Sequence, residues 1–216
     1  MSLDDVWRLF EEEVFSVPST SGGGFPLFNH YHDADPGADL PGAREIRRAN
    51  LLNYLRSFSG RPSVVVVGEA PGWRGCRFSG VPFTSEVQLL SGVLPFMGRQ
   101  SSARASPYAE TSATIFWRHM ASYRSQFLAW NCIPFHPHRP GDALSNRSPT
   151  RREIAAHLGL LSGLLSLLQP RHVVAAGRSA ELALEQIGVA ALYVRHPSCG
   201  GANEFRVGIA EVFRLL

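Results

Sequence analysis

Residues 64–84 read VVVVGEAPGWRGCRFSGVPFT, and this stretch decides the fold. The run SVVVV at 63–67 is apolar and β-branched without alternation, which is typical of a strand buried on both faces of a sheet. A glycine loop with one carboxylate, Glu69, follows directly. Ligands of parallel sheets bind beyond the carboxyl ends of the strands. The stretch therefore predicts a binding site at the loop that carries Glu69.

Three further stretches predict strands: FLAWNCI at 127–133, HVVAAG at 172–177 and ALYVRH at 191–196. Helical patterns cover seven ranges: 3–15, 42–58, 85–96, 112–124, 150–168, 178–187 and 203–215. Strands that alternate with helices predict an α/β fold with three layers, α/β/α, around a short four-stranded parallel sheet. We expect one domain over 1–216, with an acidic N-terminal helix and a long ordered loop (1–40) packed on it.

The composition excludes several classes of protein. No apolar run approaches the roughly 18–20 residues of a membrane span, and the acidic, amphipathic start differs from a signal peptide. The three cysteines, Cys76, Cys132 and Cys199, form no C-x-x-C pair. This usage predicts a cytoplasmic protein without a disulfide framework or a cysteine-built metal site.

Charge is unevenly distributed along the chain. Residues 1–40 contain one Arg and eight acidic residues, a net charge of −7, whereas 41–216 contain twenty Arg and ten acidic residues, a net charge of +10. All 21 basic residues are Arg. An Arg-rich face suits a polyanion, because guanidinium binds phosphate through two donors; a codon bias towards Arg explains the same composition. Without lysine, no mechanism through a lysine Schiff base is available.

Polar residues follow each of the four predicted strands. These segments are Gly68-Glu69-Ala70-Pro71-Gly72, Asn131 with Pro134-Phe135-His136-Pro137, Gly177-Arg178-Ser179 and His196-Pro197-Ser198. Because the carboxyl ends of parallel strands meet at one edge of a sheet, a carboxylate, an amide, an imidazole and a hydroxyl are expected to lie together there.

In this order the motifs resemble those of the uracil-DNA glycosylase superfamily, over residues 60–216. GEAPG followed by SGVPFTSEVQLL is similar to the first motif of the bacterial and archaeal family 4 enzymes, and WNCIPFHP to their middle motif. NRSPTRREIAAHLGLL with LQPRHVVAAGRSA is similar to their helix, strand and turn, and RHPS to their second active-site motif. The resemblance implies an enzyme of base excision repair that flips uracil out of DNA and hydrolyses its N-glycosidic bond.

One departure from the family 4 pattern concerns the iron–sulfur cluster, which those enzymes hold with four cysteines. Here the N-terminal region has no Cys, and the two remaining positions are Phe135 and His157. Since such clusters need thiolates, we expect no cluster and no other cofactor. We expect aromatic side chains of the 16–40 loop to fill the space: Phe25, Phe28 and Tyr31. The pairs His30/His32 and His136/His138 lack acidic or Cys partners nearby, so no metal site is expected.

The resemblance implies a role for each residue at the strand ends. Phe83 would stack on the base, or would only pack in the core. Asn131 would bind uracil N3–H and O4, or would only cap a turn. His196 would donate to O2 as negative charge develops there. Glu69 would hold or polarise the attacking water, or would only tie the loop.

The glycine loop is expected to contact the base through its backbone: Gly68, Ala70, Pro71 and Gly72. Ser198 and nearby arginines are candidate contacts of DNA phosphates. These arginines are Arg74, Arg77, Arg147, Arg151, Arg152 and Arg178.

Two features bear on the choice of substrate. The loop 199–203 lacks the apolar wedge with which related enzymes open a duplex, so single-stranded or mismatched DNA is the easier substrate. Gly72 has no side chain to exclude the methyl group of thymine, whereas Trp73 has one. We expect a monomer that acts on uracil in DNA. The alternatives are a glycosylase for another deaminated base, such as hypoxanthine or xanthine, and an inactive nucleic-acid-binding relative.

Overall fold

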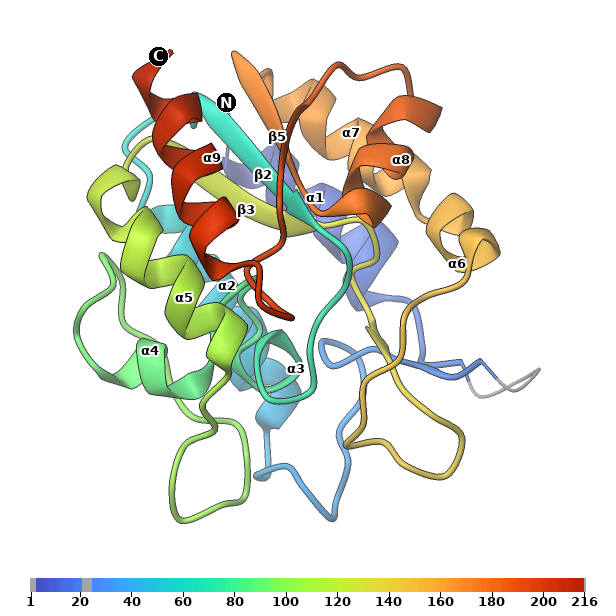
Figure 1. Ribbon diagram of the computed structural model, residues 1–216. Coiled ribbons are helices and arrows are strands. Elements are labelled where there is room, and N and C mark those ends of the chain that lie inside the picture. The colour runs from blue at the N-terminus through green and yellow to red at the C-terminus, as the bar shows by residue number, and fades with distance from the viewer. Residues whose placement is uncertain (1–2, 21–24, 216) are drawn as a thin grey trace.

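The computed structural model describes residues 3–20 and 25–215. Its centre is a parallel sheet with the strand order β3-β2-β5-β6 (Figure 1). The strands are β2 (Val64–Gly68), β3 (Phe127–Asn131), β5 (His172–Ala176) and β6 (Leu192–Val194). The four predicted strands and the α/β fold are thus confirmed. All five residues of β2 are buried, which explains why its sequence is apolar without alternation.

Helices cover both faces of the sheet. The helices are α1 (Leu3–Phe10), α2 (Ala43–Arg56), α3 (Cys76–Ser79), α4 (Glu86–Leu90), α5 (Thr111–Met120), α6 (Arg151–Ala156), α7 (Leu158–Leu168), α8 (Arg178–Gln186) and α9 (Ala202–Arg214). A π-helical turn (Glu11–Phe15) continues α1, and a 3₁₀ turn (Ala121–Tyr123) continues α5. In Figure 1, α5 and α9 lie on one side of the sheet and α7 and α8 on the other. No helix in the described part of the chain is long and apolar enough to cross a membrane.

The strand order explains this division of the helices. The chain moves one way across the sheet from β2 to β3, and the opposite way from β5 to β6. Because crossovers between parallel strands are right-handed, α5 and α8 must cover opposite faces. The loops after β2 and β5 therefore part in opposite directions, and a crevice opens between the carboxyl ends of these two strands.

Two predicted helices differ from the observed ones. The helix expected at 85–96 ends at Leu90, because Gly92 adopts a left-handed φ of 72° and Pro95 follows. The helix expected at 150–168 is interrupted at His157, whose φ of −111° and ψ of 5° separate α6 from α7.

The N-terminal segment joins the loops that follow the sheet. Strand β1 (Leu27–Phe28) pairs antiparallel with β4 (His136–Pro137). Tyr31 is buried, and its hydroxyl donates to the carbonyl of Gly80 over 2.8 Å. Phe25, which was expected to fill the interior, is 53% exposed, so that expectation is wrong. Residues 21–24 of the predicted loop lie outside the described residues.

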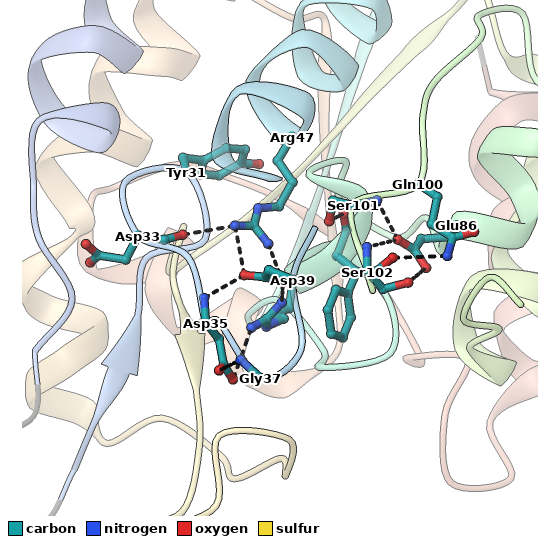
Figure 2. Close-up of polar contacts among 12 residues, drawn as sticks. Tyr31, Asp33, Asp35, Gly37, Asp39, Arg47, Glu86, Gln100, Ser101 and Ser102 are labelled. Atoms are coloured by element: carbon teal, nitrogen blue, oxygen red, sulfur yellow. Dashed lines mark hydrogen bonds and ion pairs between the residues drawn. The ribbon is translucent and has the colours of Figure 1, made fainter. Parts of the chain in front are cut away.

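A buried ion cluster holds this segment against α2 and α3 (Figure 2). The carboxylate of Asp39 accepts hydrogen bonds from Arg47 Nη1 over 3.0 Å and from Arg77 Nη1. Both arginines have no exposed surface. Arg77 also lies over the ring of Phe78, with its Cζ atom 4.0 Å from the centroid. The predicted contact of Arg77 with a DNA phosphate is therefore wrong, because its guanidinium is enclosed by the protein.

A second buried carboxylate, Glu86, fixes the segment that leads into α5 (Figure 2). It accepts from the backbone N–H groups of Ser101 at 2.8 Å, Ser102 at 2.9 Å and Tyr108 at 3.0 Å. The hydroxyl of Ser102 donates to it as well, over 2.6 Å. The start of α5 is thereby placed beside the loop that follows β2.

Replacing Asp39 with Ala should strongly destabilise the protein, because the buried guanidinium of Arg47 loses its counter-charge and that of Arg77 keeps only Asp35, at 3.8 Å. Breaking a buried ion pair costs about 3–5 kcal/mol in the free energy of unfolding, which urea denaturation measures. The control is Glu45→Ala in the exposed pair with Arg44, where a loss below about 1 kcal/mol is expected. Equal losses in the two variants would contradict the proposed importance of the Asp39 cluster.

Candidate active site

A cavity of about 410 Å³ opens at the carboxyl ends of the strands. Eight of the predicted site residues line it: Glu69, Ala70, Pro71, Gly72, Phe83, Asn131, His196 and Ser198. They come from the ends of β2, β3 and β6 and from the loop before α4. The structure therefore brings together residues that are up to 129 positions apart in the sequence.

Gly68 was predicted to contact a ligand, but it lies beneath the lining of the cavity. A Cβ atom at this position would lie 2.4 Å from Phe83 Cζ and 2.7 Å from Asn131 Oδ1. Both separations are far below van der Waals contact. Gly68 thus acts through the missing side chain, which lets the Phe83 ring and the Asn131 amide approach each other.

The Phe83 ring is held in a strained position at the wall of the cavity. Its φ of 54° is uncommon for a bulky residue, and such strain persists only where the surroundings impose it. The ring stacks on Phe116 with the centroids 4.4 Å apart and 19° between the planes. The centroid of the Phe83 ring also lies 5.8 Å from that of the His196 ring. Phe83 is therefore positioned to form one flat wall for a planar ligand.

The carboxamide of Asn131 is available to a ligand. Asn131 is the last residue of β3 and is only 5% exposed. Among the described residues, no group forms a hydrogen bond with its side chain. Because an amide has both an acceptor oxygen and donor N–H groups, the cavity favours a ligand that offers both a donor and an acceptor.

The ring of His196 is neutral and carries its proton on the nitrogen that is not held by Ser198. The hydroxyl of Ser198 lies 2.7 Å from His196 Nδ1, and the Ser198 N–H donates to the same atom over 3.2 Å. Nδ1 therefore accepts, and Nε2 carries the proton. Burial, aided by the charge of Arg195, lowers the pKa of His196 to about 4. Since both Ser198 donors face this ring, contact of Ser198 with a DNA phosphate stays a prediction that requires its hydroxyl to turn.

Glu69 is tied to the opposite side of the crevice. The hydroxyl of Ser179, at the start of α8, donates to Glu69 Oε2 over 2.5 Å. Within the described part of the chain, the other carboxylate oxygen, Oε1, makes no hydrogen bond. The carboxylate is thus fixed in place with one oxygen free for a water or a ligand. Ser179 had been noted at its strand end, but its link to Glu69 was not predicted.

Two contacts hold the loop between Glu69 and α3. The imidazole of His136 donates from Nδ1 to the carbonyl of Pro71 over 2.8 Å. The N–H of Trp73 donates to Asn146 Oδ1 over 2.9 Å. Because these partners come from the segment after β3, the β1–β4 pair also supports the shape of the site.

Of the predicted phosphate-binding arginines, Arg147 lines the main cavity, whereas Arg74 and Arg178 lie outside it. Arg74 is exposed, places its Cζ 4.6 Å from the ring of Trp73 and lines a neighbouring cavity of about 390 Å³. Arg178 is exposed on a third side of the site and pairs with Glu181. Arg147 donates to both oxygens of Glu153, so its guanidinium already serves the fold. Four of the predicted arginines are exposed and remain predicted phosphate contacts: Arg74, Arg151, Arg152 and Arg178.

Glu110 lines the cavity but was missed by the sequence analysis. It directly precedes α5 and reaches the loop at Gly72 and Gly75. Burial raises the pKa of its carboxyl, and a hydrogen bond from Ser112 acts in the opposite direction. The stretch PYAETSAT shows the start of a helix, but no local pattern indicates which loop a side chain there will meet.

The positions expected to replace cluster cysteines pack against each other. The rings of Phe135 and His157 meet edge to face, with the centroids 5.1 Å apart. Within 3–20 and 25–215, no group of three or more His, Cys, Asp or Glu side chains is arranged to hold a metal ion.

The fold and the cavity define an α/β protein with an aromatic ring, an amide and an imidazole around one cavity at the carboxyl ends of its strands. The sequence model of the uracil DNA glycosylase superfamily matches residues 56–211. The chain belongs to this superfamily, and its class is that of the DNA glycosylases.

A solved structure agrees with this assignment of the fold. The crystal structure of wild-type SMUG2 from Pedobacter heparinus matches with a TM-score of 0.71 and 14% sequence identity. The match covers 98% of this chain and 96% of that chain, so it extends beyond the residues of the superfamily match. No curated protein matches the sequence.

The protonation of His196 can be tested by nitrogen NMR of the histidine-labelled protein. We expect Nε2 to carry the proton and the ring to stay neutral down to about pH 5, since its pKa is about 4. In the unfolded chain, the ring would bind a proton near pH 6.5. Stability should therefore fall as the pH falls from about 6.5 towards 4, because the unfolded state binds more protons.

The His196 resonances are assigned by their absence from His196→Gln. A ring that titrates near pH 6.5, or that carries its proton on Nδ1, would overturn this description of His196.

Gly68→Ala should displace Phe83 and Asn131, because its Cβ would overlap both side chains. Overpacking of this kind costs about 1–3 kcal/mol in the free energy of unfolding, which denaturation measures, and a crystal structure would show the displacement. Gly60→Ala is the control, since a Cβ there meets nothing within 4 Å. An unchanged stability and an unmoved Phe83 ring in Gly68→Ala would contradict the expected overlap.

Proposed function

We propose that this protein hydrolyses the N-glycosidic bond of uracil in DNA and leaves an abasic site. One observation carries the proposal: the unpartnered amide of Asn131 lies beside Phe83 at the cavity that His196 also lines. Membership of the superfamily supports the reaction class, and the residues of the cavity support uracil as the base.

Recognition of the base depends on Phe83 and Asn131. Stacking of a base on an aromatic ring contributes about 1–3 kcal/mol. The amide of Asn131 accepts from uracil N3–H and donates to O4. Cytosine presents the reverse pattern of donor and acceptor at this edge. An Asn131 amide that presents its oxygen to N3–H and its nitrogen to O4 therefore favours uracil over cytosine.

His196 stabilises the leaving base. When the C1′–N1 bond breaks, its electron pair leaves with uracil, and negative charge accumulates on O2. The Nε2–H of the neutral ring donates a hydrogen bond to that oxygen. Ser198 keeps Nδ1 occupied as an acceptor, so the donor is always the nitrogen that faces the base.

Glu69 directs the water that replaces the base. Ser179 holds Oε2, and Oε1 binds the water. As the water oxygen bonds to C1′, the carboxylate takes up its proton and then passes it to solvent or to the departing uracil anion. The negative charge of Glu69 also stabilises the positive charge that develops on the sugar.

The surface around the cavity suits a loosened DNA strand. Arg74 and Arg178 are exposed on two sides of it and bind phosphates. The loop at 199–203 offers no apolar wedge, and Cys199 and Gly200 adopt left-handed φ values of 51° and 80°. Single-stranded DNA is therefore the preferred substrate, ahead of U:G and U:A pairs. We further propose a monomer in the cytoplasm, in line with the three free cysteines.

The test measures turnover on labelled oligonucleotides that contain one uracil, followed by alkali to cleave abasic sites. Wild type should cleave the single strand fastest, and Asn131→Ala and His196→Ala should each lose about 100-fold or more in rate. The controls are Asn53→Ala on the exposed face of α2 and His172→Ala at the amino end of β5.

Three outcomes distinguish the alternatives. Loss of cleavage in Asn131→Ala and His196→Ala, but not in the two control variants, supports the proposal. Cleavage of hypoxanthine or xanthine, but not uracil, would replace it with a glycosylase for another deaminated base. Salt-dependent DNA binding without cleavage of any of these bases would indicate an inactive relative.

A further inference from the structure

We propose that Glu110 sets the size limit of the base pocket, filling the space beside Gly72 so that a base with a substituent at C5 is excluded. This inference rests on the proposed function, and it concerns a residue that no family motif in the chain contains. It also answers how a pocket with glycine at position 72 can reject thymine.

The first argument is the position of the carboxyl group. A Cβ atom on Gly72 would lie 2.1 Å from Glu110 Oε1, and a Cβ atom on Gly75 would lie 2.3 Å from Glu110 Oε2. The carboxyl of Glu110 therefore occupies the space that side chains on this loop would otherwise fill. Two glycines, three residues apart, leave room for one side chain from a distant segment.

The second argument concerns Trp73, the side chain of this loop that the sequence suggested for excluding thymine. Trp73, the candidate from the sequence, does not line the main cavity. Its ring packs edge-on against Tyr108 with the centroids 5.3 Å apart and lines the neighbouring cavity. Glu110 lines both cavities and thus stands at the boundary between them.

The third argument is that Glu110 is rigidly placed. Glu86 holds the backbone of Tyr108, two residues before it, through a buried hydrogen bond of 3.0 Å. Helix α5 begins immediately after it. A side chain between two fixed segments cannot easily retreat from a substituent on the base, so a clash there costs binding energy.

The contacts proposed for the base determine which of its edges faces Glu110. In the proposed complex, Asn131 binds N3–H and O4, His196 binds O2, and Phe83 covers one face of the ring. The C5–C6 edge is the one that these contacts leave open, and Glu110 closes the wall at Gly72. A methyl group there would meet a carboxyl that must lose hydration without gaining a hydrogen bond. Burial also raises the pKa of this carboxyl.

The test compares single-stranded oligonucleotides that contain uracil, 5-bromouracil or thymine. In Glu110→Ala, the kcat/KM values for thymine and 5-bromouracil should rise relative to uracil by about 10- to 200-fold, the usual range for one methyl-sized group in a pocket. Glu110→Gln has the same size without the charge and should keep the wild-type ratios. Glu110 makes no capping hydrogen bond to α5, so both variants are expected to fold.

A refilling variant provides the sharpest control. Gly72→Ala alone should clash with Glu110, whereas Gly72→Ala combined with Glu110→Ala has room for the added methyl group. The double variant should return the thymine-to-uracil ratio towards the wild-type value. This recovery would not occur if Glu110 acted only through the stability of the protein, which denaturation monitors in parallel.

Unchanged ratios in Glu110→Ala, or equal changes in Glu110→Ala and Glu110→Gln, would overturn the size limit while leaving the uracil activity intact. Calorimetric binding of free uracil and 5-bromouracil separates this failure from that of the proposed function, because it needs no turnover. A wild type that binds uracil over 5-bromouracil, with the preference lost in Glu110→Ala, supports the inference even without cleavage. Equal binding of the two bases by wild type would overturn the size limit, whereas absence of uracil cleavage in the turnover assay would overturn the proposed function.

Discussion

The guanidinium groups of Arg47 and Arg77 are buried against the carboxylate of Asp39, and Arg77 Nη2 also lies 3.8 Å from Asp35 Oδ2. Arg47 belongs to α2, Arg77 to α3, and Asp39 to the N-terminal segment, so this cluster fixes three parts of the chain that lie far apart in sequence. Burying a charged group is costly unless an opposite charge pairs with it. The two arginines can therefore stay buried only while the segment with Asp39 stays in place. Since α3 lies between the glycine loop and Phe83, the shape of the cavity depends on the same cluster.

Glycines without steric room for a side chain give the site its dimensions. Gly68 admits the Phe83 ring and the Asn131 amide, and Gly72 admits Glu110. At the far side, Gly177, with a φ of 98°, would place a Cβ atom 3.2 Å from that of His196. In each case the contacting side chain comes from another element of the fold. The close packing of functional groups thus depends on pairs of residues that are distant in the sequence. In each pair, a glycine without a side chain leaves room for the side chain of the other residue.

This dependence explains how far the sequence can predict the structure. The strands were predictable because burial on both faces produces apolar runs that are visible locally, as in Val64–Val67. The meeting of Glu69, Asn131 and His196 was predictable because the ends of parallel strands meet at one edge.

Other features depend on contacts that no local pattern encodes. Glu110 reaches the site only because Gly72 and Gly75 lack side chains. Arg77 looked like a surface cation, since its burial follows from Asp39, 38 residues earlier. The break at His157 interrupts a stretch with strong helical periodicity, where packing of α6 and α7 overrides local propensity.

The distribution of charge in the cavity suits a reaction that separates charge. On the proposed function, positive charge develops on the sugar and negative charge on the base. The carboxylate of Glu69 is held on one side by Ser179, and the neutral His196 and Asn131 are the groups assigned to the base.

A hydrogen bond from a neutral donor strengthens as negative charge grows on its acceptor, and it requires no burial of an ion before the reaction. A charged imidazolium would have to be buried in the empty site, which the low pKa of His196 shows to be unfavourable. On the proposed function, the site therefore stabilises the separated charges with fixed dipoles on the side of the base and with one anchored anion on the side of the sugar.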